Sequence, residues 1–127
     1  MSFPFDSNEG LLIVPAKLWG PNGDTVLRLA LDTGATYSLV SYDILMLLGY
    51  DPSSIGTRIR ITTASGVEYA PQIVIEKIEV LGQERPQFPV LCHTLPATAN
   101  LDGLLGLDFF RGQRLVLDFG AGTVTVD

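Results

Sequence analysis

The stretch of sequence that decides the fold is LALDTGA, residues 29–35. Three apolar residues, Leu29 to Leu31, lead directly into Asp32, so we expect this carboxylate at the end of a largely buried strand. A carboxylate in such a dry position is costly unless it is hydrogen-bonded, and such positions are often functional. Gly34 gives the backbone the freedom to turn sharply. The simpler interpretation is a plain turn, in which Asp32 bonds its own backbone and Gly34 takes a positive φ.

The composition around this stretch is that of a folded domain with an apolar interior. Of the 127 residues, 46% are apolar and only 17% are charged, which excludes a disordered chain. The length predicts one domain over residues 1–127, large enough to bury its own core. Because the chain is apolar for a soluble protein, a buried subunit interface is also expected.

The charge balance argues against nucleic acid as a partner. Eight Lys and Arg residues stand against fourteen Asp and Glu residues, and the net charge is -6. No Lys/Arg cluster exceeds two nearby residues, such as Arg58 and Arg60, whereas phosphate binding needs concentrated positive charge.

Cysteine usage and the N-terminus predict a cytoplasmic location without membrane association. Cys92 is the single cysteine, so no disulfide forms within the chain and a reducing compartment fits. The N-terminus has no basic segment, and the apolar run from Leu11 to Val14 is too short for a signal core or a membrane span. The sequence equally fits a fragment of a longer protein.

Apolar side chains recur at every second position in several stretches, which is typical of strands with differently solvated faces. Turn signals at residues 21–24, 65–66 and 120–122 separate them, and the first two predict hairpins. Many short strands favour a closed or sandwich-like β domain. The apolar faces are Leu27, Leu29 and Leu31; Ile59 and Ile61; Phe88, Val90 and Cys92; and Leu115, Leu117 and Phe119.

Two segments interrupt the β pattern and are expected to be helical. Ser41 is placed to cap a helix that runs to Leu48, with Gly49 as its terminator. Residues 104–110 are a second, shorter candidate.

A second motif, DGLLGLDFF, occupies residues 102–110. Its Leu104-Leu105-Gly106 resembles the hydrophobic-hydrophobic-Gly element of retropepsin-like aspartic proteases, in which a strand ends at this element and a short helix follows. The order of elements is also similar to that family over roughly residues 11–126: a hairpin, an apolar strand into Asp-Thr-Gly-Ala, a flap hairpin, this element, a helix and terminal strands. The helix after Ser41 makes bacterial and cellular members more similar than viral ones.

The resemblance implies a mostly β, closed barrel-like acid protease fold with one or two short helices. It implies that Asp32 is the catalytic carboxylate, supported by Thr33 and Gly34. Gly34 and Ala35 would lie along a substrate backbone, beneath a flap formed by residues 62–67. No metal or cofactor is implied. The substrate-binding residues that follow from the resemblance are Ala35, Thr63, Ala64, Ser65 and Gly66.

The chemistry of this family requires two carboxylates, so the sequence predicts a homodimer. One carboxylate takes a proton from water while the other, protonated, polarises the scissile carbonyl. The chain has one Asp-Thr/Ser-Gly: residues 118–120 lack the hydroxyl residue, and residues 102–103 lack the middle position. A two-fold axis would supply the second Asp32. The terminal strand, residues 123–126, is the expected contributor to the interface, because an unpaired apolar edge there would invite aggregation.

Three functions compete at this point. The first is an aspartic endopeptidase that acts on extended polypeptides. The second is a catalytically silent peptide-binding or dimerisation module on the same fold, because a fold does not guarantee activity. The third is an unrelated small β-barrel binding domain in which Asp32-Thr33-Gly34 is only a turn.

Other chemically suggestive residues receive structural interpretations. Adjacent strand residues point to opposite faces, so Cys92 and His93 do not pair as nucleophile and base. Cys92 is expected in the core, and His93, the single histidine, leaves no second histidine for a zinc site. Tyr69 is expected as a packed aromatic on a flap strand rather than a substrate contact. Residues 36–38 receive no role.

Overall fold

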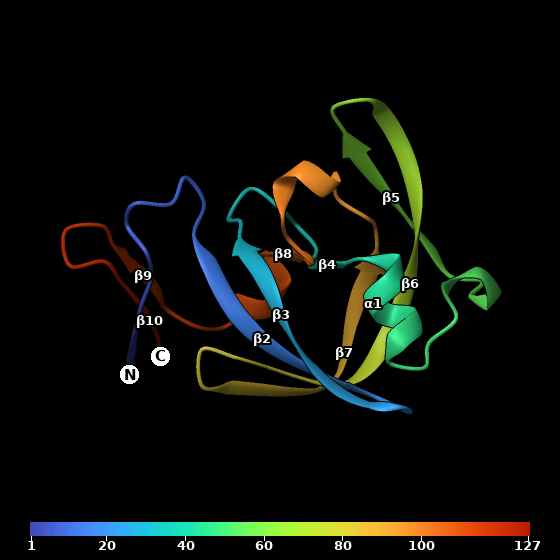
Figure 1. Ribbon diagram of the computed structural model, residues 1–127, viewed down its shortest axis with the longest axis horizontal. Helices are drawn as coiled ribbons and strands as arrows, with labels where there is room; N and C mark the ends of the chain where they lie inside the picture. The colour runs from blue at the N-terminus through green and yellow to red at the C-terminus, as the bar shows by residue number, and fades with distance from the viewer.

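The computed structural model describes residues 1–127, which form a β-rich molecule with short helical turns (Figure 1). This confirms the expected mostly β class. None of the helices has the length and apolar character that crossing a membrane requires. The strands are β1 (Ser2–Pro4), β2 (Ile13–Gly20), β3 (Gly23–Leu31), β4 (Leu39–Val40), β5 (Arg58–Thr63), β6 (Gly66–Val80), β7 (Gln83–Cys92), β8 (Gly103–Leu105), β9 (Leu115–Asp118) and β10 (Thr123–Val126). The helices are α1 (Tyr42–Leu47) and three 3₁₀ turns, η1 (Pro52–Ser54), η2 (Ala97–Ala99) and η3 (Leu107–Phe110).

Six strands close into a barrel, as the sequence predicted. They pair in the order β2-β3-β8-β4-β7-β6, and β6 pairs back with β2 through residues 16–19 and 77–80. Strand β5 pairs only with β6, and the two extend away from the barrel as a long hairpin (Figure 1). The closed ring leaves β5 as the free edge of this sheet.

The apolar side chains that recur at every second position in the sequence contribute to the hydrophobic core. In β3, Leu27, Leu29 and Leu31 are buried, whereas Arg28 points outward. A single apolar cluster of 21 buried residues forms the core, and it joins the barrel to Val124 and Val126 of β10. The predicted alternation does not extend to Phe119, because β9 ends at Asp118 and Phe119 is 70% exposed, with its ring edge-on to Phe5.

The first helix is close to its prediction, and the second differs. Helix α1 covers residues 42–47 and ends at Gly49, whose φ of 97° only glycine adopts readily. Ser41 occupies the cap position, but its side chain makes no capping hydrogen bond. The prediction of a helix from Leu104 was wrong in its first half, because Leu104 and Leu105 belong to β8 and the helical turn η3 begins at Leu107.

The terminal strand is not an edge, which corrects the sequence-based expectation. Strand β10 is the middle strand of a separate three-stranded sheet, ordered β1-β10-β9. It pairs with β1 on one side and β9 on the other, so its backbone groups are used within the chain. The unpaired edges of this sheet are β1 and β9.

Strand β8 lies between β3 and β4 and brings two distant loops together. It runs parallel to β3, with Leu31 opposite Leu105, and antiparallel to β4, with Val40 opposite Gly103. A Cβ at Gly103 would overlap the Leu39 carbonyl, and one at Gly106 would lie 2.7 Å from the Tyr37 carbonyl. Glycine is therefore required at both positions for this close approach.

We expect Gly103→Ala to lower the free energy of unfolding, because the added methyl group would force β8 away from β4. Overpacking of this kind costs about 1–3 kcal/mol. Denaturant titration would measure the change, with Gly10→Ala as the control, since a Cβ there meets no atom within 4 Å. Equal stability of the two variants would contradict the close packing of these strands.

Candidate active site

Asp32 lies immediately after β3, where the parallel pairing with β8 ends. Its N–H donates to the Leu105 carbonyl at 2.9 Å, which joins the ends of the two strands. Its Oδ1 accepts the Gly34 N–H at 2.8 Å, and its carbonyl accepts the Ala35 N–H at 3.1 Å. The carboxylate thus organises its own turn. The plain-turn interpretation is only partly met, because Gly34 is not among the glycines with a positive φ.

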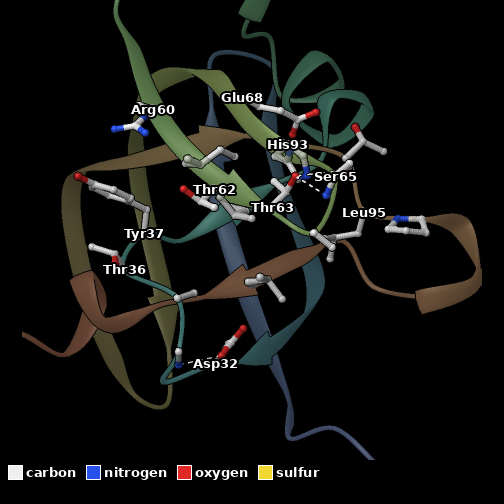
Figure 2. Close-up of a pocket in the computed structure, with 18 residues that line it drawn as sticks. Asp32, Thr36, Tyr37, Arg60, Thr62, Thr63, Ser65, Glu68, His93 and Leu95 are labelled. Carbon is white, nitrogen blue, oxygen red and sulfur yellow. Dashed lines mark hydrogen bonds and ion pairs between the residues drawn. The ribbon is translucent and has the colours of Figure 1, made fainter.

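Asp32 also remains accessible from the cavity. Its side chain is half-buried and points toward the large cavity drawn in Figure 2. Thr33 beside it is exposed, does not line the cavity, and has a hydroxyl without a hydrogen-bond partner in the chain. The loop therefore presents one carboxylate to the cavity and one free hydroxyl to the outside.

The cavity has a volume of about 950 Å³ and is bounded by the Asp32 loop, the β5–β6 hairpin and the segment after β7 (Figure 2). It unites Asp32, Gly34 and Ala35 with Thr63, Ala64 and Ser65 from the hairpin. Of the residues that the sequence analysis selected, Thr33 and Gly66 do not line it. The other lining residues, which that analysis did not select as site residues, are Thr36, Tyr37, Leu39, Arg60, Ile61, Thr62, Glu68, His93, Thr94, Leu95, Pro96 and Leu104.

The β5–β6 hairpin lies where the sequence predicted a flap, and its tip is one residue earlier than predicted. Thr63 pairs with Gly66, so Ala64 and Ser65 form the turn, and Gly66 takes a φ of 124°. The Thr63 hydroxyl accepts the Ser65 N–H at 3.3 Å and donates to the Gly66 carbonyl at 3.2 Å. Side chain and backbone together hold the tip in one shape.

Tyr69 is neither packed nor in the cavity, so the expectation of a packed aromatic was wrong. Its side chain is 64% exposed. Alternation of faces does not account for this position, because the cross-strand partner Arg60, which lies on the same face of the hairpin as Tyr69, lines the cavity.

The charged side chains of the cavity lie on two sides of it. On one side, His93 Nδ1 lies 3.6 Å from a Glu68 oxygen, so the segment after β7 contacts the flap. The His93 backbone is fixed by an N–H bond to the Val40 carbonyl at 3.1 Å. On the other side, Arg60 forms no ion pair and lies near Tyr37 in Figure 2.

Cys92 does not pair with His93, as expected. It does not line the cavity that His93 lines, and it packs against the hydrophobic core. Burial raises the pKa of the Cys92 thiol, and the positive charge of Arg58 opposes that shift. A protonated thiol on the far side of the strand is a poor nucleophile.

Behind the Asp32 loop lies a buried polar network that the sequence analysis did not find. Ser38 is 1% exposed and is the one polar side chain among the fully buried residues. Its hydroxyl donates to Asp108 at 2.7 Å and accepts the Gly106 N–H at 3.0 Å. The Ser38 N–H donates to the other Asp108 oxygen at 2.9 Å. An aspartate inside an apolar motif was the available signal, because such a group requires partners.

Comparison with known proteins agrees with this geometry. The family model described as aspartyl protease matches residues 14–109. The chain belongs to the aspartyl protease family. This assignment confirms the resemblance drawn from residues 29–35 and 102–110, and it shows that the interpretation as an unrelated β-barrel domain was wrong. No curated protein matches the chain significantly.

Solved structures show that the fold of this aspartyl protease family member is retropepsin-like. The crystal structure of a retropepsin-like aspartic protease from Rickettsia conorii matches with a TM-score of 0.72 and 19% identity, over 99% of this chain and 88% of that chain. The crystal structure of the retroviral protease-like domain of Ddi1 from Leishmania major matches with a TM-score of 0.60 and 19% identity, over 94% of this chain and 90% of that chain.

We expect Cys92 to react slowly with iodoacetamide in the native protein. A raised pKa means a smaller thiolate fraction at a given pH, so the half-maximal rate should occur at higher pH than in the urea-unfolded chain. Alkylation followed by mass spectrometry between neutral and alkaline pH would measure both rates. A native rate equal to the unfolded rate at every pH would contradict the burial of this thiol.

Proposed function

We propose that this protein is an aspartic endopeptidase that hydrolyses peptide bonds in extended polypeptides, with Asp32 from each of two identical subunits as the catalytic pair. The observation that carries the proposal is the half-buried Asp32 carboxylate in the cavity beneath the flap, in a chain of the aspartyl protease family. We propose that residues 1–127 form a single protease domain and that two copies of this domain form the active enzyme.

The second carboxylate has no source within one chain. Glu68 is the other carboxylate that lines the cavity, and it is engaged by His93. A two-fold axis beside the exposed Thr33 would place a second Asp32 against the first, and the free Thr33 hydroxyl would have a partner across that axis. Two carboxylates at such close range share one proton, so their titration belongs to the pair.

The shared proton defines the reaction. The ionised Asp32 takes a proton from a water molecule, and the resulting nucleophile attacks the scissile carbonyl carbon. The protonated Asp32 of the other subunit donates a hydrogen bond to the carbonyl oxygen as negative charge develops there. Collapse of the tetrahedral intermediate breaks the C–N bond, and a proton from the pair passes to the leaving amine.

The cavity walls favour a substrate in extended form. Gly34 and Ala35 form one wall and the flap residues 63–65 the other, so backbone groups are available on both sides of a strand-like peptide. Leu39, Ile61 and Leu104 supply apolar surface between these walls, which favours apolar side chains next to the scissile bond. Gly66 acts on the substrate indirectly, through the shape of the flap tip.

The alternative is a catalytically silent module that binds extended peptides or dimerises. The bond from Gly34 N–H to Asp32 Oδ1 favours it in one respect, because this bond gives the carboxylate a purely structural use. Such a module would bind extended peptides and leave them intact across the acid range. The cavity and flap are common to both functions, so turnover is the property that separates them.

We expect Asp32→Asn to abolish cleavage, because an amide cannot act as the general base. General acid–base groups contribute about 10²–10⁴-fold, so residual activity should be lower by at least that factor. Peptide-library cleavage from acidic to neutral pH, read by mass spectrometry, is the measurement.

The matched control is Asp118→Asn, which changes the chain's other Asp-x-Gly segment, a turn that also accepts a backbone N–H. It should retain full activity. Cleavage by Asp32→Asn at the wild-type rate would overturn the assignment, and binding without cleavage by the wild type would favour the silent module.

A further inference from the structure

We propose that Asp108, acting through Ser38, is a positioning residue that fixes the loop carrying Asp32. This inference rests on the proposed function, and it adds a second aspartate per subunit with a distinct role. Asp108 does not line the cavity and so does not touch a substrate there. Its two carboxylate oxygens instead accept the Ser38 hydroxyl and the Ser38 N–H, at 2.7 and 2.9 Å.

The direction of each hydrogen bond in this network is fixed. A carboxylate only accepts, so the Ser38 hydroxyl must donate its proton to Asp108. The lone pairs of the same hydroxyl then face Gly106, whose N–H donates to Ser38 Oγ at 3.0 Å. None of the ion pairs in the chain includes Asp108. Ser38 is therefore the one group that links this carboxylate to the active-site loop.

Gly106 transmits the position of this network to the catalytic aspartate. The residue before it, Leu105, accepts the Asp32 N–H at 2.9 Å, and the residue after it, Leu107, donates its N–H to the Ala35 carbonyl at 2.9 Å. Gly106 is also confined, since even a Cβ would come within 2.8 Å of the Ala35 carbonyl oxygen. A shift of Gly106 would thus displace both ends of the Asp32 turn.

The chemistry of the dyad makes this placement consequential. Two carboxylates share a proton only at close range, and a misplacement of about 1 Å at a reacting group can cost about 10²-fold in rate. The separation also sets how far apart the two titrations of the pair lie. Loosening the Asp108 network should therefore change the pH dependence of catalysis as well as its rate.

The test compares Asp108→Asn with Asp102→Asn in the full chain. Asparagine at 108 replaces one of the two acceptor oxygens by an NH₂ group, so either the Ser38 N–H or the Ser38 hydroxyl proton loses its acceptor. Asp102 lies in the same motif, directly before β8, and its Oδ2 accepts the Arg28 N–H of β3 at 2.8 Å. Asparagine satisfies that single donor through its oxygen, so this control should retain wild-type kinetics.

For Asp108→Asn we expect kcat to fall by about 10²-fold with KM nearly unchanged, and the two limbs of the pH profile of kcat/KM to move. Ser38→Ala should change both quantities in the same direction, and the double variant should be non-additive because both changes act on one network. A loss of active molecules through misfolding would lower the amplitude of the profile and leave its limbs in place. Unmoved limbs in both single variants would overturn the proposal.

Amide hydrogen exchange supplies a reading that does not depend on activity. The N–H groups of Asp32, Gly106 and Leu107 should exchange faster in Asp108→Asn than in wild type, while those in the β9–β10 sheet should not. A wild-type protein that cleaves nothing would end the proposed function, and the exchange data would still decide whether Asp108 fixes the loop. Unchanged exchange rates at all three amides would by themselves contradict the positioning role of Asp108, whatever the activity data show.

Discussion

The hydrogen bond from the Asp32 N–H to the Leu105 carbonyl is the constraint on which the site depends. It continues the parallel pairing of β3 with β8 by one residue beyond Leu31 and Leu105. The turn that holds the Asp32 carboxylate begins at this point. Strand β8 can enter between β3 and β4 only because Gly103 and Gly106 leave room for neighbouring carbonyl groups. The barrel thus supplies a base, and the Asp32 loop and the β5–β6 hairpin line the cavity above it.

Local pattern predicted much of this arrangement. The apolar residues Leu29 to Leu31 predict a largely buried strand that ends at Asp32, and the structure confirms that strand. The apolar pair before Gly106 could be read only with a family resemblance, because two leucines and a glycine fit a strand or a helix equally well. This ambiguity explains why the predicted helix began too early.

The remaining features depend on contacts between distant segments, which leave no period in the sequence. Ser38 and Asp108 are 70 positions apart, and each is unremarkable until β8 and the Asp32 loop are brought together. The pairing of β10 with β1 was equally hidden, because β1 lies at the opposite end of the chain. Phe119 continues an apolar alternation, but the turn that follows Asp118 takes it out of the strand and into solvent.

The central claim is that catalysis belongs to a pair of subunits, each contributing one Asp32. Mixing wild-type and Asp32→Asn protein at constant total concentration, with time for subunits to exchange, tests it directly. If both carboxylates are required, activity should follow the square of the wild-type fraction, so an equal mixture should retain about a quarter of the activity. A linear dependence, with about half the activity in the equal mixture, would contradict a shared active site.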